Sequence, residues 1–383
     1  MTYFFYFYIL FIGIFYTVYS FLNVYRWNKL KDYNYENQDN KIFFSIIISI
    51  RNEAENIENC IASILKQNYP TSSFEIIIVD DYSSDNSIDL IKNFKSENIH
   101  VLHLSDYISA DYKGGFKKKA IEFGIKNSKG SWIITTDGDV VAEKSWLATI
   151  NSYIHQNNSK MISGPVLFMN HKSIFERFQC LDFAGMMLIT GAGYTYSNPF
   201  LCNGANLAFE KSAFYELGGY DGNENIPSGD DLFLLEKIKT KFPNQVHFLK
   251  TTTALIYSFP KTTTSSYVHQ RLRWGTKTTK LKDKSILFTL GLIWLNCFNI
   301  CLGVIIFPFI SLNFFILILI VWVLKLVADN FLLSRSTKFW KVESFMKTFL
   351  FSELYHTFFT AFIGLLGIFS KKTDWKSREI NLN

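Results

Sequence analysis

The chain has 383 residues, of which 48% are hydrophobic and 17% aromatic, including 38 phenylalanines. This composition is unusual for a fully soluble protein and favours the presence of membrane-spanning segments. The formal net charge of +6 is too small to indicate a nucleic-acid-binding protein, so no nucleic acid is expected as a partner. The five cysteines are odd in number and scattered, which argues against a disulfide framework and against a zinc site.

The first apolar segment, residues 3–22, carries no charged side chain and is long enough to cross the hydrocarbon core as a helix. A cleaved signal peptide would have basic residues before the apolar run. Here Arg26, Lys29 and Lys31 follow it instead. This order predicts an uncleaved anchor, residues 1–30, whose C-terminal side faces the cytoplasm.

A second uncharged stretch, residues 285–324, is too long for one crossing and contains Pro308 near its middle. We expect two helices, 286–306 and 309–328, because proline interrupts a continuous helix. Basic residues flank the pair on both sides, so an out-and-back hairpin satisfies the positive-inside rule.

The last apolar stretch, residues 348–369, contains Glu353 and His356 and is followed by four basic residues. A full crossing would place these charges outside, so an interfacial or re-entrant helix is the preferred interpretation, with a crossing helix left open. Glu353 and His356 form either a functional pair or a polar patch at a headgroup or protein surface. The C-terminal membrane region is expected to cover residues 280–370 of a multi-pass protein in the cell membrane.

Residues 41–275, between the membrane segments, follow a different pattern, in which short apolar runs alternate with amphipathic ones. The expected strands are 43–50, 74–79, 100–104 and 132–136, and the expected helices are 52–66, 83–94 and 120–127. This alternation predicts a cytoplasmic α/β domain with a mainly parallel sheet and helices on both faces. In such sheets ligands bind at the carboxyl ends of the strands.

Acidic residues stand at two of these strand ends. Asp80 and Asp81 follow the second strand, where a carboxylate can accept hydrogen bonds from a nucleotide base or ribose. A turn with a helix cap is the alternative explanation, and we assign Asp85 to the cap. Asp137 and Asp139 follow the fourth strand, where two carboxylates can share Mg²⁺ or Mn²⁺ with diphosphate oxygens. An acidic turn is the alternative explanation for this second pair.

Two further motifs come later in the chain. Asp230 and Asp231 open an apolar segment, and one of them can act as a general base for an acceptor hydroxyl; helix capping is the alternative. In the box Gln270–Trp274, Arg273 can neutralise a diphosphate and Trp274 can stack on a sugar. A basic juxtamembrane helix with an interfacial tryptophan is the better explanation of this box when its residues are taken alone.

Taken together in chain order, these motifs resemble the membrane-bound family 2 glycosyltransferases with a GT-A fold. That group includes hyaluronan, chitin and poly-N-acetylglucosamine synthases and ceramide glucosyltransferases. The resemblance runs from about Ser45 to Trp274 and rests on Ser49–Glu53, Asp80 with Asp81, Lys117, Asp137 with Asp139, Asn203–Asn206 with Gly218–Asp221, Gly229–Asp231, and Gln270, Arg273 and Trp274. Asp230 stands where glutamate is commoner. Trp375–Glu379 also resembles a tail found after the last membrane segment of such proteins.

The resemblance implies a GT-A fold with a mixed sheet, helices on both faces, and transmembrane helices at both ends of the chain. It implies donor-binding roles for Glu53, Asp80, Asp81, Lys117, Asp137 and Arg273, metal binding by Asp139 with Asp137, and catalytic roles for Asp231 and Asp230. Gln270, Arg273 and Trp274 would form the acceptor-side box. Asp231 is expected to be the general base of a single displacement that inverts the configuration of a sugar transferred from a UDP-sugar.

The acceptor is expected to be a membrane-associated glycan or lipid. Polymer synthases that extrude their product usually have more membrane helices than the three or four expected here, which favours a single-transfer glycolipid synthase as the alternative. A non-catalytic membrane protein that binds nucleotide-sugar is the more distant alternative, because it would not need Asp231 or the Gln270–Trp274 box.

Overall fold

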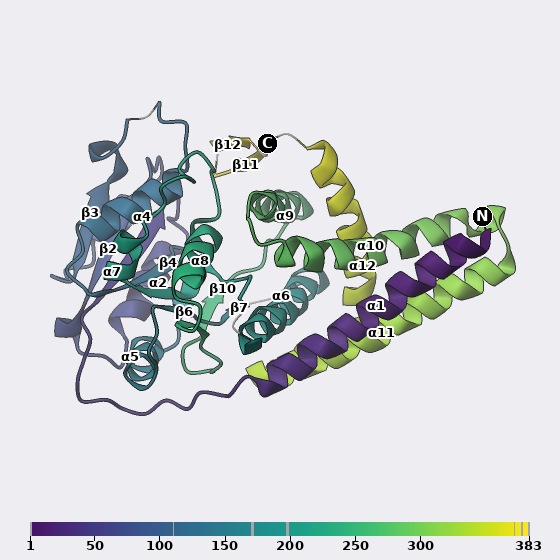
Figure 1. Ribbon diagram of the computed structural model, residues 1–383. Helices are drawn as coiled ribbons and strands as arrows, with labels where there is room; N and C mark the ends of the chain where they lie inside the picture. Colours follow the sequence, from purple (N-terminus) through teal and green to yellow (C-terminus); the bar gives the residue numbers. More distant parts are fainter. Residues whose placement is uncertain are drawn as a thin grey trace.

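A seven-stranded mixed sheet forms the centre of the domain that follows the first helix (Figure 1). The computed structural model describes residues 2–109, 111–169, 172–196, 199–370, 372–376 and 378–381. In spatial order the strands are β3 (Ile99–His103), β2 (Phe74–Asp80), β1 (Phe44–Ile50), β4 (Trp132–Asp137), β8 (Leu207–Glu210), β6 (Met161–Ser163) and β9 (Val246–Phe248). The first four are mutually parallel, whereas β8 runs antiparallel to both β4 and β6. The sheet is therefore mixed, as the family resemblance implied.

The parallel half of the sheet forms because its strands are apolar on both faces. Ile46 of β1 pairs with Ile76 of β2 on one side and with Ile134 of β4 on the other, and all three are completely buried. Such continuous β-branched runs suit strands covered by helices on both sides. The four strands predicted from the sequence are confirmed, with small shifts at their ends.

The helices that follow these strands differ from the predicted ranges. They are α2 (Ile57–Leu65), α3 (Ser87–Lys92) and α4 (Phe116–Lys126), against expected ranges of 52–66, 83–94 and 120–127. The first two begin late because Asn52 and Tyr82, just after β1 and β2, have left-handed φ values of 50° and 54°. A helix cannot continue through such a residue, so each strand first enters a turn. The prediction that Asp85 caps this helix is wrong by one residue, because the N-cap of α3 is Asn86; Asp85, just before it, accepts a hydrogen bond from the backbone N–H of Ser87 at 3.0 Å.

The remaining elements complete the domain. They are β5 (Val141–Ala142), α5 (Trp146–Gln156), β7 (Val166–Phe168), α6 (Ile174–Gly193), α7 (Lys211–Glu216), α8 (Asp230–Lys241), β10 (Ile256–Ser258) and α9 (Thr264–Thr279). Strands β5, β10 and β7 form a small second sheet. In Figure 1, α6 and α9 lie between the large sheet and the long C-terminal helices. These two helices therefore connect the sheet to the membrane region.

Four helices of the described chain are long and apolar enough to cross a membrane. They are α1 (Thr2–Lys29), α10 (Ser285–Ile306), α11 (Leu312–Trp340) and α12 (Phe349–Phe369). Helix α11 extends well beyond the predicted end at residue 328, because the charged Lys325 and Asp329 lie inside it and pair with each other at 2.6 Å. The break near Pro308 is confirmed as the short turn Phe307–Phe309.

Helices α1, α10 and α11 run alongside one another, whereas α12 runs across their common direction (Figure 1). Gly13 of α1 allows close packing on α11, since a Cβ atom there would lie 2.8 Å from Val321 Cγ1. The start of α1 lies at the α10–α11 turn, where the Tyr6 and Ser311 hydroxyls are 2.9 Å apart. After α12, the short hairpin of β11 (Lys372–Trp375) and β12 (Arg378–Asn381) returns to the sheet domain.

Candidate active site

A cavity of about 1070 Å³ begins at the carboxyl ends of β1 and β4 and continues between α6, α9, α10 and α12. Its wall contains most of the predicted site residues: Glu53, Lys117, Asp137, Asp139, Asp230, Asp231, Gln270, Arg273 and Trp274. Asp80 and Asp81 are not among the described residues that line it. Residues from segments far apart in the sequence thus meet in one hollow that reaches from the sheet to the membrane helices.

Lys117, in the first turn of α4, joins two of the acidic motifs. Its Nζ atom lies 2.7 Å from Asp137 Oδ1 and 3.8 Å from Asp230 Oδ2. Burial opposes the charge on Lys117, but the carboxylates of Asp137 and Asp230 outweigh it and raise the pKa of the lysine. Burial likewise opposes the charge on Asp137, and the adjacent Lys117 keeps the pKa of this carboxyl below its usual value. Both groups are therefore charged at neutral pH.

Asp139 and Glu53 bring two further carboxyl groups close to Asp137. The backbone of Gly138 packs against the end of β1, where a Cβ atom would lie 3.0 Å from Ile50 Cγ2 and 3.1 Å from Glu53 Cγ. A side chain at this position would push the two segments apart, which explains the glycine. Burial and the negative charge of Asp139 raise the pKa of Glu53 to about 7. These carboxyl groups are the oxygen ligands that could hold a divalent cation.

Asp231 is the second residue of α8 and is paired with a lysine of α9. Its two carboxylate oxygens accept hydrogen bonds from Lys277 Nζ at 3.0 and 3.1 Å, and its Oδ1 atom also accepts from the N–H of Leu232 at 2.8 Å. Burial opposes the charge on Asp231, but Lys277 and then Lys117 keep the pKa of Asp231 below its usual value. Asp231 is thus an ionised carboxylate at neutral pH, as a general base must be.

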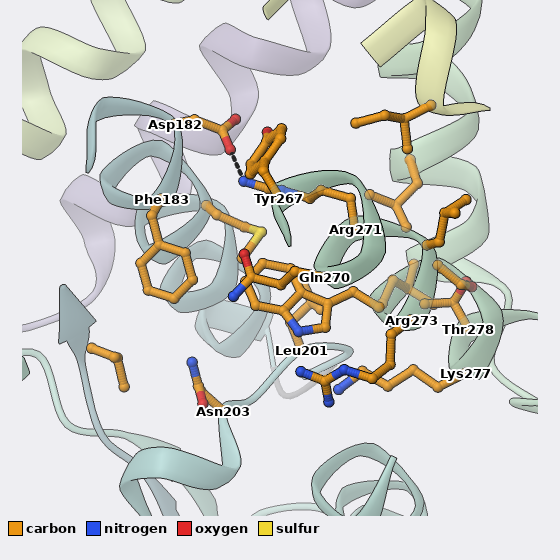
Figure 2. A pocket seen from close by; sticks show the side chains of 18 of the residues that line it. Asp182, Phe183, Leu201, Asn203, Tyr267, Gln270, Arg271, Arg273, Lys277 and Thr278 are labelled. Carbon is orange, nitrogen blue, oxygen red and sulfur yellow. Dashed lines mark hydrogen bonds and ion pairs between the residues drawn. The ribbon is translucent and has the colours of Figure 1, made fainter. Parts of the chain in front are cut away.

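Helix α9 presents the Gln270–Trp274 box to the cavity (Figure 2). Arg271 forms an ion pair with Asp182 of α6, and its guanidinium carbon lies 5.0 Å from the centre of the Trp274 ring. Arg273 and Lys277 extend together to the same side of the cavity in Figure 2. Burial lowers the pKa of Arg273, against the opposing effect of the carboxylates of Asp137 and Asp230. Of the box, Arg273 is therefore the residue whose charge faces the acidic motifs.

The acidic pair at the end of β2 has a different environment. Asp80 Oδ1 accepts from the N–H of Ser83 at 3.1 Å, so this side chain holds the turn. Asp81 is fully buried and its two oxygens accept from Arg378 of β12 at 2.7 and 2.9 Å. Burial raises the pKa of Asp81, although Arg378 acts against this effect. The donor-binding role predicted for this pair stays a prediction.

Three basic residues of the site were not found from the sequence: Lys277, Lys376 and Arg378. Lys277 follows Arg273 at i+4 and Gln270 at i+7, so helical spacing alone places it on the cavity face of α9. Lys376 contacts Glu53, and its carbonyl oxygen accepts from Arg51 Nε at 3.2 Å. Lys376 and Arg378 belong to the tail that resembles the family motif, although Ser377 within it lies outside the described residues.

The chain matches known protein families and several known proteins. Residues 45–218 match the family described as Glycosyl transferase family 2, and residues 132–328 match Glycosyl transferase family group 2. The chain is 30% identical over 128 residues to Glycosyltransferase AglE of Haloferax volcanii, a match that covers 33% of this chain and 40% of AglE. It is 27% identical over 206 residues to the poly-beta-1,6-N-acetyl-D-glucosamine synthase of Staphylococcus aureus, covering 51% of this chain and 46% of the synthase. The chain thus spans less than half the length of these two relatives.

A similar fold occurs in the mannosyltransferase PcManGT of Pyrobaculum calidifontis, whose structure was solved with GDP-Man and Mn²⁺. The two structures share a TM-score of 0.51 at 15% sequence identity, and the match covers 91% of this chain and 99% of PcManGT. At this identity the likeness concerns the fold, which is that of a GT-A enzyme with a mixed sheet. With half of its length matched to the family group, this chain belongs to the family 2 glycosyltransferases.

Proposed function

We propose that the protein is an inverting glycosyltransferase that moves a sugar from a nucleotide-diphosphate donor, expected to be a UDP-sugar, to a membrane-associated acceptor. The observation that carries the proposal is the single cavity in which Asp137, Asp139, Asp231 and Arg273 meet and which continues between the membrane helices. The nucleotide sugar named in the PcManGT structure supports a nucleotide-diphosphate donor. The product named for the S. aureus synthase supports transfer of a sugar to a glycan.

In the proposed reaction the acceptor hydroxyl oxygen attacks the anomeric carbon from the face opposite the diphosphate. Asp231 takes the hydroxyl proton, the new C–O bond forms, and the bond from the anomeric carbon to the diphosphate oxygen breaks. A single displacement inverts the configuration at that carbon. Lys117 and Arg273 are the cations that would offset the charge growing on the leaving diphosphate.

Asp137 and Asp139 would hold Mg²⁺ or Mn²⁺, with Glu53 beside them. The fit rests on the chemistry of the donor set, because Glu53, Asp137 and Asp139 line the same cavity and carboxylate oxygens are the ligands that these cations prefer. In this structure Lys117 pairs with Asp137 and Lys376 with Glu53, while burial and then repulsion from Asp139 raise the pKa of Glu53. A bound divalent cation would relieve this repulsion and supply positive charge to the diphosphate.

Replacing Asp139 by Ala tests the metal role. The Asp139→Ala variant is expected to lose metal-dependent UDP affinity by about tenfold or more, because losing even an outer-shell partner of a metal ligand typically costs this much. Isothermal titration of UDP with and without Mn²⁺ measures the effect. Asp89→Ala, an exposed change remote from the cavity, is the control and should bind as the unchanged protein does. An unchanged metal-dependent affinity in Asp139→Ala would remove Asp139 from the metal site.

We infer further that α12 does not cross the membrane. Asp81 lies in the sheet domain and binds Arg378, which follows α12, so the tail and the domain must share one side of the membrane. The hairpin of α10 and α11 already returns the chain to the side on which α9 lies. A crossing by α12 would separate Arg378 from Asp81. This proposal divides the chain into an anchor at 1–30, a catalytic domain at 41–275 and a membrane region at 280–370. The membrane region ends in an interfacial or re-entrant helix.

Reporter fusions in bacterial cells test the topology. A green fluorescent protein fused after residue 383 should fluoresce and alkaline phosphatase fused there should be inactive, because the tail is expected in the cytoplasm with the basic flanks. Alkaline phosphatase inserted at the α10–α11 turn should be active. An active phosphatase at the C-terminus would instead mean that α12 crosses.

A further inference from the structure

Beyond the catalytic end, the cavity continues between two membrane helices. We call this part the corridor and define it by Leu287, Leu290, Gly291 and Ile293 of α10 and Ile363 and Ile368 of α12, all of which line the cavity. We propose that the acceptor is a neutral membrane lipid with a free hydroxyl group, and that its hydrocarbon chains lie in the corridor. This inference rests on the proposed function and names its acceptor class.

The corridor has the side chains that suit hydrocarbon rather than sugar. Its defining residues are aliphatic or glycine, and Thr289, Trp294 and Thr360 of the same two helices also line the cavity. Sugar sites generally combine aromatic faces with convergent hydrogen-bonding groups. Trp294 is a neighbouring aromatic residue, but it is used in helix packing. Its indole N–H donates to the carbonyl of Ala361 at 3.3 Å, and its ring lies against Gly364, where a Cβ atom would be 2.0 Å away. The lining therefore favours acyl or alkyl chains over a passing polysaccharide.

The cavity also borders a charged cluster buried among the helices, which comprises Asp182, Arg271, Lys325, Asp329, Glu353 and His356. Lys325 Nζ is at its centre and donates to Asp329 Oδ2 at 2.6 Å, Glu353 Oε2 at 2.5 Å and His356 Nδ1 at 3.1 Å. Asp329, Glu353 and His356 are close enough together to suggest a metal site. The ammonium of Lys325 already supplies the positive charge there, so the cluster needs no metal.

The balance of charge in this cluster favours a neutral headgroup. Its two cations face three carboxyl groups: Arg271 pairs with Asp182, and Lys325 with Asp329 and Glu353. His356 accepts a hydrogen bond at Nδ1, which requires the ring without a proton there. The cluster thus has no surplus cation for a lipid phosphate, which would need several charge-assisted donors. At the catalytic end of the cavity, Lys277 is paired with Asp231 and Lys117 with Asp137. A polyprenyl phosphate is disfavoured, and a hydroxyl-bearing neutral lipid is favoured.

Two buried polar atoms in the cavity wall are available to such a headgroup. Ser352 Oγ and Gln270 Oε1 have no hydrogen-bond partner within the described part of the chain. Buried polar atoms are normally paired, so a ligand is a natural partner for both. The Ser352 hydroxyl can donate to an ester or amide carbonyl of a lipid, and Gln270 can accept from its O–H or N–H.

Helix α9 sets the distance between the charged cluster and the base. Arg271 belongs to the charged cluster and pairs with Asp182, whereas Lys277, further along the same helix, pairs with Asp231. Lys277 is six positions after Arg271, which corresponds to about 9 Å along a helix. A headgroup can therefore contact the wall near the cluster while its hydroxyl oxygen reaches Asp231. That oxygen bonds to the anomeric carbon, its proton passes to Asp231, and the diphosphate leaves with the electron pair of the broken C–O bond.

The test uses the full chain in phosphatidylcholine vesicles. Release of nucleoside diphosphate is measured with UDP-glucose, UDP-galactose, UDP-N-acetylglucosamine and GDP-mannose, with dioleoylglycerol, ceramide, undecaprenyl phosphate or a chito-oligosaccharide as acceptor. We expect dioleoylglycerol or ceramide to stimulate release and to yield a sugar-bearing lipid extractable into chloroform. Stimulation confined to undecaprenyl phosphate or the oligosaccharide would overturn the proposal. Absence of donor binding and of release with every acceptor would instead overturn the proposed function.

Filling the corridor supplies the matched variants. A Cβ atom at Gly291 meets nothing within 4 Å, so the first side-chain atom of Gly291→Phe meets no protein atom, and its ring is added at the corridor. We expect Gly291→Phe to lower the lipid-dependent rate by about tenfold or more, because the ring occupies space needed by the hydrocarbon chains of the lipid. We expect Ile363→Phe, on the facing helix α12, to have the same effect. Donor affinity and acceptor-independent hydrolysis should be unchanged, which also reports that the variants fold. Ile305→Phe, on the exposed face of α10, is the control and should keep the lipid-dependent rate of the unchanged protein. A full lipid-dependent rate in both Gly291→Phe and Ile363→Phe would contradict the proposal that lipid chains lie in the corridor.

Discussion

The Asp231→Asn variant is expected to turn over roughly 10²–10⁴-fold more slowly than the unchanged enzyme, while it still binds the donor. The carboxylate is ionised because Lys277, at 3.0 Å, outweighs the cost of burying it. An amide of the same shape can still accept from Leu232 N–H and Lys277 through its oxygen, but its NH2 group loses the second bond from Lys277 and the side chain cannot take up the acceptor proton. Turnover at saturating donor, with UDP affinity measured by calorimetry in parallel, separates loss of the base from loss of binding.

Asp230→Asn is the matched control, because Asp230 is the adjacent carboxylate and lies 3.8 Å from Lys117 rather than against Lys277. We expect a smaller loss of turnover in this variant, accompanied by a change in donor affinity through Lys117. If Asp231→Asn retained near-normal turnover, or if Asp230→Asn lost more, the base would have to be reassigned within the pair.

The strands and the site at their ends could be predicted because the signals are local. Ile46–Ile48 and Ile76–Ile78 are buried on both faces, and such runs identify central strands without any knowledge of partners. Asp137 follows its strand directly, so knowing the strand also placed the carboxylate. Helix starts were less predictable, since the left-handed Asn52 and Tyr82 delay α2 and α3, and the sequence carries no periodic signal for a turn.

Contacts between distant segments could not be predicted in this way. Glu353 and His356 were noted as either functional or merely polar, but their partner Lys325 lies on another helix, and nothing in the local pattern links the two. Helix α6 was also missed, although Ser173 and Glu176 form a capping box that marks its start. The long-range pairing of Arg378 with Asp81 depends on how α12 directs the tail, which is a property of the whole fold.

That pairing leads to the second large expected effect. Replacing Arg378 by Ala should lower the free energy of unfolding by about 3 kcal/mol, because it leaves the fully buried Asp81 carboxylate without its partner. The loss includes two charge-assisted hydrogen bonds, at 2.7 and 2.9 Å, and the contact of the guanidinium with Phe116, whose ring centre is 3.6 Å away. Denaturant unfolding of the protein in detergent micelles, followed by tryptophan fluorescence, measures the change.

A double-mutant cycle identifies the cause of that loss. If the penalty comes from an unpaired buried charge, Asp81→Asn in the Arg378→Ala background should recover part of the stability, since a neutral amide is less costly to bury than a carboxylate. Arg378→Lys, which keeps the charge but cannot donate bidentately or lie flat on Phe116, should fall between the unchanged protein and Arg378→Ala. Faster hydrogen exchange in the turn from Asp80 to Ser84 would locate the weakening. Additive losses in the cycle would mean instead that Arg378 stabilises the tail through Phe116 and β11, and not through Asp81.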